Sequence, residues 1–200
     1  MIQGKPNRRS LRLRGYDYSE PGAYFITVCT QRRECLFGEI VDGKMWLNEY
    51  GQIVHDEWFR AASIRPYVHL FEDEWIIMPN HVHGIIWISE GIVKATRQVG
   101  ATRRVAPTNG RPCGPQPGSI GAIVGQFKSI TTKRINHHRG ALGAALWQRN
   151  YYEHTIRDET ALHCIRQYIL ENPLKWHLDW ENPNRVGKDE IWSEIVRGIR

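Results

Sequence analysis

The chain has 200 residues, of which 41% are hydrophobic and 10% aromatic, enough to fill the core of one domain of ordinary size. No run of eighteen apolar residues occurs, which excludes a membrane span, and the basic segment MIQGKPNRRSLRLRG has no apolar stretch of a secretory signal behind it. The four cysteines include no CxxC pair, which speaks against a zinc knuckle and is typical of unpaired thiols in a reducing compartment. We therefore expect a globular, cytosolic protein.

The net charge of +6 is distributed unevenly along the chain. Residues 1–16 and 91–152 together hold most of the excess of lysine and arginine, and neither stretch contains an aspartate or a glutamate. Basic segments beside an acidic remainder are typical of polyanion binding, because each neutralised phosphate releases condensed counterions. A solvent-exposed tail and loop would have the same charge pattern. The charge distribution alone therefore suggests nucleic acid as a partner without establishing it.

Strand and helix signals alternate along the chain. In order, we expect a strand over 23–30, a weaker strand near 37–47 with a turn at Asp42-Gly43, a helix over 49–64, a strand over 74–78, a break at Pro79-Asn80, a strand over 81–88, a helix over 119–138, a strand over 151–156 and a helix from 159 to about 172. Asn48, Ser119 and Asp158 are good N-caps for the three helices.

This order of elements predicts an α+β fold. The simplest version is a ferredoxin-like sandwich: an antiparallel sheet with helices packed on one face, plus a C-terminal helix. Residues 89–118 lose periodicity and gather proline and glycine, which indicates a long mobile loop. We divide the chain into a basic arm over 1–22, a main domain over 23–175 and a C-terminal extension over 176–200.

The triplet His81-Val82-His83 is a candidate metal site. Side chains alternate along a strand, so the two histidines project from one face while Val82 points to the other. Neighbouring neutral imidazoles can share a cation when each ring is oriented by a hydrogen-bond acceptor. Two structural histidines on a strand would look the same in sequence, and two ligands do not complete a site.

The helix before Pro173 offers a nucleophile and a further ligand. Tyr168 and Asn172 are four residues apart and share a helical face. A free phenol with a pKa of about 10 is only about one part in a thousand ionised at neutral pH, so a nearby metal would be needed to make it attack a phosphodiester. Tyr168 would otherwise be an ordinary core or surface aromatic residue.

Several segments in order and spacing resemble the REP-associated tyrosine transposases, single-tyrosine members of the HUH superfamily of single-strand nucleases. They cover roughly residues 8–176 and are RRSLRLRGYDYSEPGAYFITVCTQRR, EWIIMPNHVHGIIWI, SIGAIVGQFKSITTKRIN, LWQRNYYEHTIRDE and YILENPLKW. The resemblance implies a ferredoxin-like catalytic domain over 23–175 in which His81, His83 and Asn172 bind the metal and Tyr168 is catalytic. His154 also belongs to a family pattern, and a structural place on its strand is as good an interpretation.

The resemblance further implies Mg²⁺ or Mn²⁺ as cofactor and single-stranded or hairpin DNA with repeated palindromes as partner. It also implies that the DNA is cleaved and rejoined through a 5′-phosphotyrosine, and that the protein is located at the nucleoid in the bacterial cytosol. We expect phosphate contacts to come from the cations of the arm and of the helix over 119–138, namely Arg8, Arg9, Arg12, Arg14, Lys128, Lys133 and Arg134. Monomer and homodimer are both open.

Two other functions fit the same residues less well. A regulator that binds palindromic DNA without cleaving it would not need all of His81, His83, Tyr168 and Asn172. A metal-dependent nucleotide hydrolase of the histidine-triad kind would need a further histidine at position 85, which is Ile85, and would have no use for Tyr168.

Overall fold

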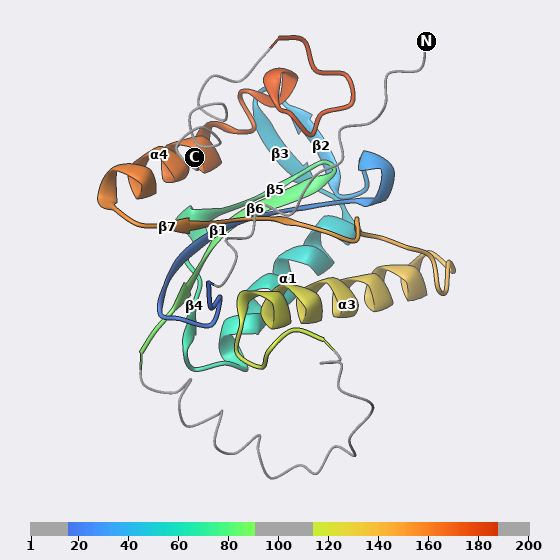
Figure 1. The fold of residues 1–200 in the computed structure, drawn as a ribbon. Helices are drawn as coiled ribbons and strands as arrows, with labels where there is room; N and C mark the ends of the chain where they lie inside the picture. The colour runs from blue at the N-terminus through green and yellow to red at the C-terminus, as the bar shows by residue number, and fades with distance from the viewer. Residues whose placement is uncertain (1–15, 91–113, 188–200) are drawn as a thin grey trace, which may run out of the picture.

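The computed structural model describes residues 16–90 and 114–187, and an antiparallel sheet forms its middle layer (Figure 1). β1 (Gly22–Cys29) lies between β6 (His81–Ile88) and β7 (Tyr152–Ile156). The other edge of β6 pairs with β4 (Val68–His69) at one end and with β5 (Trp75–Met78) at the other. All four pairings are antiparallel, and β1 and β6 pair over their full eight residues.

Three helices cover the two faces of this sheet (Figure 1). α1 (Glu49–Ser63) and α3 (Ile120–His138) pack side by side on one face, and α4 (Glu159–Glu171) lies on the other. The side chains of Asn48, Ser119 and Asp158 accept hydrogen bonds from backbone N–H groups of the first turns, as predicted. Since the sheet separates α4 from α1 and α3, the alternation of side chains along each strand decides which helix a residue meets.

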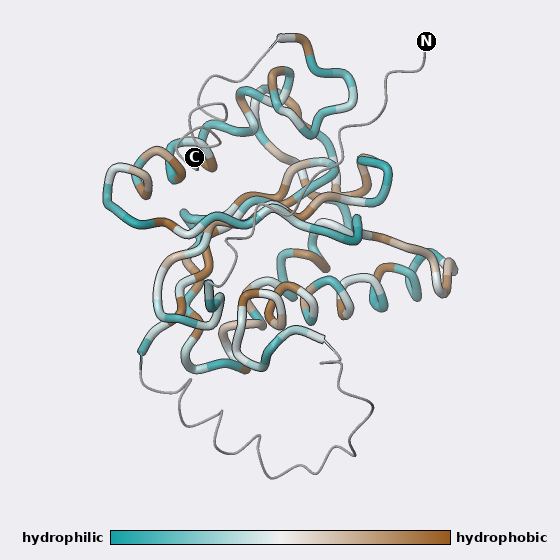
Figure 2. Tube along the Cα trace, viewed as in Figure 1, coloured by the Kyte–Doolittle hydropathy of each residue, from teal (hydrophilic) through white to brown (hydrophobic). Residues whose placement is uncertain are grey.

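That alternation gives two hydrophobic cores. Tyr24, Ile26 and Val28 of β1 belong to the larger core with α1 and α3. Ala23 and Phe25 belong to the smaller core, which α4 closes with Leu162, Ile165, Tyr168 and Ile169. Figure 2 shows hydrophobic residues running through the central strands and recurring along each helix with polar residues between them. Because both faces of β1 are covered, its residues from Ala23 onward are all buried.

The predicted fold class is confirmed. Counting only β1, β5, β6 and β7, the sheet runs β5-β6-β1-β7, and α1 and α3 provide the two crossovers on one face. This is the split β-α-β arrangement of a ferredoxin-like sandwich. α4 follows the last strand and is the additional C-terminal helix that carries Tyr168. The boundaries of the basic arm and of the C-terminal extension stay predictions.

The observed secondary structure differs from the prediction only in short segments of the described residues. Residues 37–47 form a separate hairpin of β2 (Gly38–Val41) and β3 (Lys44–Leu47), whose turn at Asp42-Gly43 has positive φ at both residues. β4 was not predicted, because two paired residues leave no periodic signal. Single 3-10 turns, η1 (Gln31–Arg33), η2 (Glu72–Glu74) and η3 (Trp176–Leu178), were also missed. The predicted loop lies outside the described residues over 91–113.

Cys29, Cys35 and Cys164 form no disulfide, as expected of unpaired thiols. No helix in residues 16–90 and 114–187 combines the length and the apolar character that crossing a membrane requires.

Gly84 lets a tryptophan of α1 lie directly on the face of the sheet opposite the two histidines. A Cβ at this position would stand 2.5 Å from Cζ2 of Trp58, whose ring stacks on that of Trp75 at a centroid distance of 5.0 Å. Replacing Gly84 with alanine should therefore displace Trp58 and lower the free energy of unfolding by about 1–3 kcal/mol. Urea unfolding followed by tryptophan fluorescence measures this loss. Gly125→Ala is the control, because nothing lies within 4 Å of a Cβ there; equal stability of the two variants would contradict this packing.

Candidate active site

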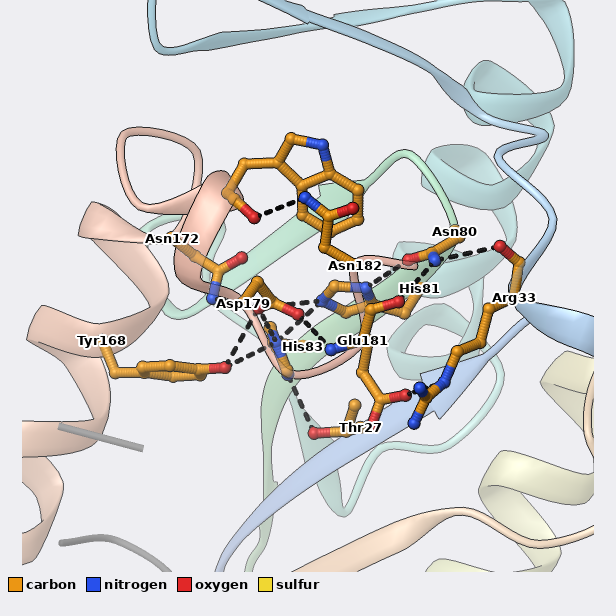
Figure 3. Close-up of polar contacts among 11 residues, drawn as sticks. Thr27, Arg33, Asn80, His81, His83, Tyr168, Asn172, Asp179, Glu181 and Asn182 are labelled. Atoms are coloured by element: carbon orange, nitrogen blue, oxygen red, sulfur yellow. Dashed lines mark hydrogen bonds and ion pairs between the residues drawn. The ribbon is translucent and has the colours of Figure 1, made fainter. Parts of the chain in front are cut away.

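His81 and His83 project from the same face of β6, as the strand alternation predicted, and the structure shows that α4 covers this face. In the register of the sheet they stand opposite Cys29 and Thr27 of β1, and their exposed fractions are 0% and 1%. Their Nε2 atoms are 2.9 Å apart. The two rings form a T-shaped pair, with their planes 70° apart, on the side of the sheet that α4 covers (Figure 3).

Each ring is held by a hydrogen bond at Nδ1, which leaves Nε2 directed into the site. Asn80 Oδ1 lies 2.7 Å from His81 Nδ1, and Thr27 Oγ1 lies 2.8 Å from His83 Nδ1. The Asn80 amide nitrogen donates to the carbonyl oxygens of Arg33 and Glu181, which assigns Oδ1 as the atom facing His81. Oδ1 can only accept, so His81 Nδ1 carries the proton and His81 Nε2 carries a lone pair.

Asp179 is the third member of this cluster, and the sequence analysis did not identify it. Its carboxylate is 1% exposed, with Oδ2 at 3.8 Å from His81 Nε2 and 3.9 Å from His83 Nε2. His81, His83 and Asp179 are the one group of three or more potential ligand residues found in the described parts of the chain, with ligand atoms within 4.8 Å of one another. Asp179 follows η3, so residues 176–187 of the predicted extension supply part of the site.

Tyr168 on α4 and Asn172, the C-cap of this helix, share the helical face predicted from their spacing, and both contact Asp179. The Tyr168 hydroxyl lies 3.2 Å from His83 Nε2 and 3.4 Å from Asp179 Oδ2, to which it donates. The Asn172 amide nitrogen donates to Asp179 Oδ2 at 3.0 Å, while its Oδ1 is buried and has no hydrogen-bond partner. Figure 3 shows Tyr168 and Asn172 approaching Asp179 from one side and the histidines from another.

These donor atoms fit a divalent cation. Two ligands at about 2.1 Å from an octahedral ion, at right angles, would be about 3.0 Å apart, close to the 2.9 Å between the two Nε2 atoms. Asp179 adds an anionic oxygen, and the adjoining Asn172, whose amide nitrogen donates to Asp179, has a buried Oδ1 with no hydrogen-bond partner. Imidazole nitrogens together with a carboxylate oxygen are a ligand set for a divalent metal ion.

The protonation of the cluster suits metal binding. Burial lowers the pKa of His81 to about 4, against the attraction of Asp179, so its ring is neutral at neutral pH. Burial raises the pKa of Asp179, but the adjacent His81 and His83 and the Asn172 amide outweigh it and hold that pKa below its ordinary value. A neutral imidazole beside an ionised carboxylate is the state in which both bind a cation.

The buried histidine makes the metal-free protein sensitive to mild acid. His81 has a pKa of about 4 when folded and about 6.5 when unfolded, so between these values the unfolded chain binds more protons and stability is lost as the pH falls. From pH 7.5 to 4.5 in EDTA, urea unfolding should show a loss of about 2–3 kcal/mol from this residue. His154, whose pKa is also lowered by burial, acts in the same direction.

A comparison of variants isolates the contribution of His81. The loss between pH 7.5 and 4.5 should be smaller in His81→Gln, which cannot titrate, and His154→Gln should remove only the share of His154. Asp179 does not affect this comparison. Because the pKa of Asp179 is lowered in the folded protein, its contribution to the free energy of unfolding is lost only at pH values below this interval. An identical pH dependence in the wild type and His81→Gln would contradict the buried neutral ring.

The predicted DNA-binding residues that the structure describes lie on α3, across the sheet from the histidines. Lys133 is exposed, Arg134 pairs with Glu57 at 2.7 Å, and the Lys128 amine donates to the carbonyl oxygens of Gln148 and Arg149. These three cations therefore cannot contact the same phosphate as the metal site. Arg8, Arg9, Arg12 and Arg14 lie outside the described residues, and His154 is half-buried on β7.

The fold defines the class: the chain is an α+β protein with the fold of the REP-associated tyrosine transposases. A solved structure of such a protein bound to a REP hairpin aligns with a TM-score of 0.53 and 20% identity, over 82% of this chain and 73% of that one. The resemblance seen in the sequence is confirmed in this respect.

A closer relative in sequence comes from Haemophilus influenzae. It is described as an uncharacterized protein and is 41% identical over 182 residues, which cover 88% of this chain and 93% of the relative. The chain belongs to the same family as that protein. No family model matches the chain.

Proposed function

We propose that the protein is a DNA transposase, a single-strand endonuclease that cleaves and rejoins hairpin DNA through a 5′-phosphotyrosine at Tyr168, with Mg²⁺ or Mn²⁺ as cofactor. The observation that carries the proposal is the position of the Tyr168 hydroxyl, 3.2 Å from His83 Nε2 and 3.4 Å from Asp179 Oδ2. A tyrosine beside a cluster of metal ligands has the groups that phosphodiester attack needs.

The residues of the cluster would have two roles, metal binding and nucleophilic attack. His81, His83 and Asp179 would hold the cation, with Asn172 as the further ligand that the sequence suggested. When bound, the cation would supply Lewis-acid polarisation of the scissile phosphate and lower the barrier to attack. Tyr168 would form its O–P bond as the bond from phosphorus to the 3′ oxygen breaks. The phenol would lose its proton to solvent as this bond forms, and the departing 3′ oxygen would take up a proton from solvent and leave as a 3′-hydroxyl.

Rejoining uses the same groups in reverse. The O–P bond to Tyr168 preserves the energy of the phosphodiester, so the 3′-hydroxyl of a second strand can attack it and release the phenol without ATP. Strand transfer is therefore the expected outcome when a second DNA end is present, and simple hydrolysis is not.

DNA must reach a hydroxyl that is buried in this structure, because Tyr168 is only 3% exposed. Asp179, to which the hydroxyl donates, belongs neither to the sheet nor to α4 but to the irregular segment after η3. We infer that residues 176–187 shift when the scissile strand enters. Lys128, Lys133, Arg134 and the four arginines of the arm would bind other parts of the hairpin, with phosphate contacts setting its position.

The same burial favours a second candidate, a regulator that binds palindromic DNA without cleaving it. A nucleophile closed off from solvent would be harmless in such a protein. The two functions predict different chemistry with one substrate, so a single experiment separates them.

The test incubates the protein with a palindromic DNA hairpin that carries single-stranded flanks, in Mg²⁺, in Mn²⁺ and in EDTA, followed by intact-mass spectrometry and denaturing gels. A metal-dependent protein–DNA adduct with release of a 3′-hydroxyl fragment is the expected result. Binding without reaction would support the regulator. Free hydrolysed product without an adduct would indicate a metal-dependent hydrolase and would overturn the proposal.

A further inference from the structure

Arg33 lies at the edge of the candidate active site in a strained turn. It ends η1, which follows β1 directly, and both Arg32 and Arg33 have left-handed backbone conformations, with φ of 59° and 60°. Side chains with a Cβ rarely adopt this region, and two such residues in succession persist only where surrounding contacts hold them. The turn therefore fixes where the Arg33 guanidinium is presented.

Asn80 joins this turn to the histidines. Its amide nitrogen donates to the Arg33 carbonyl oxygen at 3.1 Å and to the Glu181 carbonyl oxygen at 2.8 Å, and its Oδ1 lies 2.7 Å from His81 Nδ1. One buried side chain therefore connects Arg33, the segment that carries Asp179, and the metal-binding strand (Figure 3).

The partner of the Arg33 guanidinium is a buried carboxylate. Arg33 Nε lies 2.9 Å from Glu181 Oε2, and the Glu181 side chain is 5% exposed, against 34% for that of Arg33. Glu181 is two residues from Asp179, and its backbone N–H donates to Asp179 Oδ1 at 2.6 Å. A carboxylate and a phosphodiester offer a guanidinium the same kind of anionic oxygen pair, so one can replace the other.

We propose that Arg33 is a phosphate-binding residue for the single strand that enters the active site, and that Glu181 occupies its place in the absence of DNA. The inference rests on the proposed function. It adds a cation on the α4 side of the sheet, where the α3 lysines and arginine do not reach. On DNA binding, the guanidinium would exchange the Glu181 carboxylate for a phosphate adjoining the scissile one, and the released Glu181 would move with residues 176–187.

The exchange predicts opposite effects for the two partners of the ion pair. In fluorescence-anisotropy titrations with a fluorescently labelled hairpin carrying single-stranded flanks, Arg33→Gln should weaken binding about tenfold and lower the slope of log affinity against log salt by about 0.7, the value for one single-strand phosphate contact. Glu181→Gln should strengthen binding, because Arg33 no longer has to leave a carboxylate. Arg33→Lys should keep the salt slope near that of the wild type.

Arg60→Gln is the matched control, because Arg60 also pairs with a buried glutamate, Glu57, but on the opposite face of the sheet. It should leave affinity and salt slope unchanged. If Arg33→Gln and Glu181→Gln both lose stability in urea while both bind DNA as the wild type does, the ion pair is structural and the proposal is wrong. If the wild type itself binds no hairpin, the proposed function fails, whichever way the variants behave.

Discussion

Replacing Tyr168 with phenylalanine should abolish the covalent adduct with DNA and leave hairpin binding within about twofold of the wild type. The ring of Tyr168 packs edge-on against Phe25 and His83, contacts that phenylalanine keeps. Only the hydroxyl and its hydrogen bonds are lost, which changes the free energy of unfolding by about 1 kcal/mol. Intact-mass spectrometry after incubation with hairpin and Mn²⁺ measures the adduct, and electrophoretic mobility shift measures binding.

Tyr152→Phe is the control for this variant, because Tyr152 lies on β7 and its ring also packs against Phe25. It should form the adduct at the wild-type level. An adduct that persists in Tyr168→Phe would rule out Tyr168 as the nucleophile. Loss of binding together with the adduct would instead indicate that the hydroxyl organises the DNA-binding surface.

Replacing Asp179 with asparagine should lower the affinity for Mn²⁺ by at least about 100-fold. Changing a group that only hydrogen-bonds to a metal ligand typically reduces metal affinity about 10–100-fold. Asp179→Asn removes the negative charge of a residue that we propose as a direct ligand, so the loss should be at least as large. The side chain keeps its size, so the buried position is still filled. Isothermal titration calorimetry with Mn²⁺ gives the affinity, and the same preparation should lose adduct formation.

Two further variants make this result specific. Asp158→Asn removes another carboxylate from the α4 region but preserves an N-cap, so its Mn²⁺ affinity should match the wild type. Asn172→Ala tests the ligand predicted from sequence. If Asn172→Ala abolishes binding and Asp179→Asn does not, the metal is held by the two histidines and Asn172, and Asp179 only positions Asn172.

The strongly periodic parts of the fold could be predicted from the sequence. The strand over 81–88 has an apolar pattern, and the helices that begin after Asn48, Ser119 and Asp158 have both an apolar pattern and a capping residue. Each of these elements occurs at the predicted place. β4 was missed because it is defined by pairing with β6, a contact distant in sequence. The two layers of helices follow from strand alternation, but the assignment of α4 to the opposite face required the register of the sheet.

The site was predicted in part. Local spacing is sufficient to place His81 beside His83, and Tyr168 beside Asn172, because a strand and a helix each have a fixed repeat. Asp179 has no such repeat, since it follows η3 in an irregular segment. The available signal was an acidic residue amid tryptophans just after the tyrosine helix, and it does not tell where the carboxylate points. Arg33 was missed for the same reason, because its position depends on a turn with unusual φ values.

The most direct test of the proposed function is to locate the adduct on the chain. The protein is incubated with a hairpin bearing single-stranded flanks and Mn²⁺, treated with nuclease and protease, and its peptides are sequenced by tandem mass spectrometry. We predict a residual 5′-linked nucleotide on Tyr168, within the peptide that contains Gln167-Tyr168-Ile169. A nucleotide on any other residue, or no modified peptide while the DNA is cut, would contradict the proposed function.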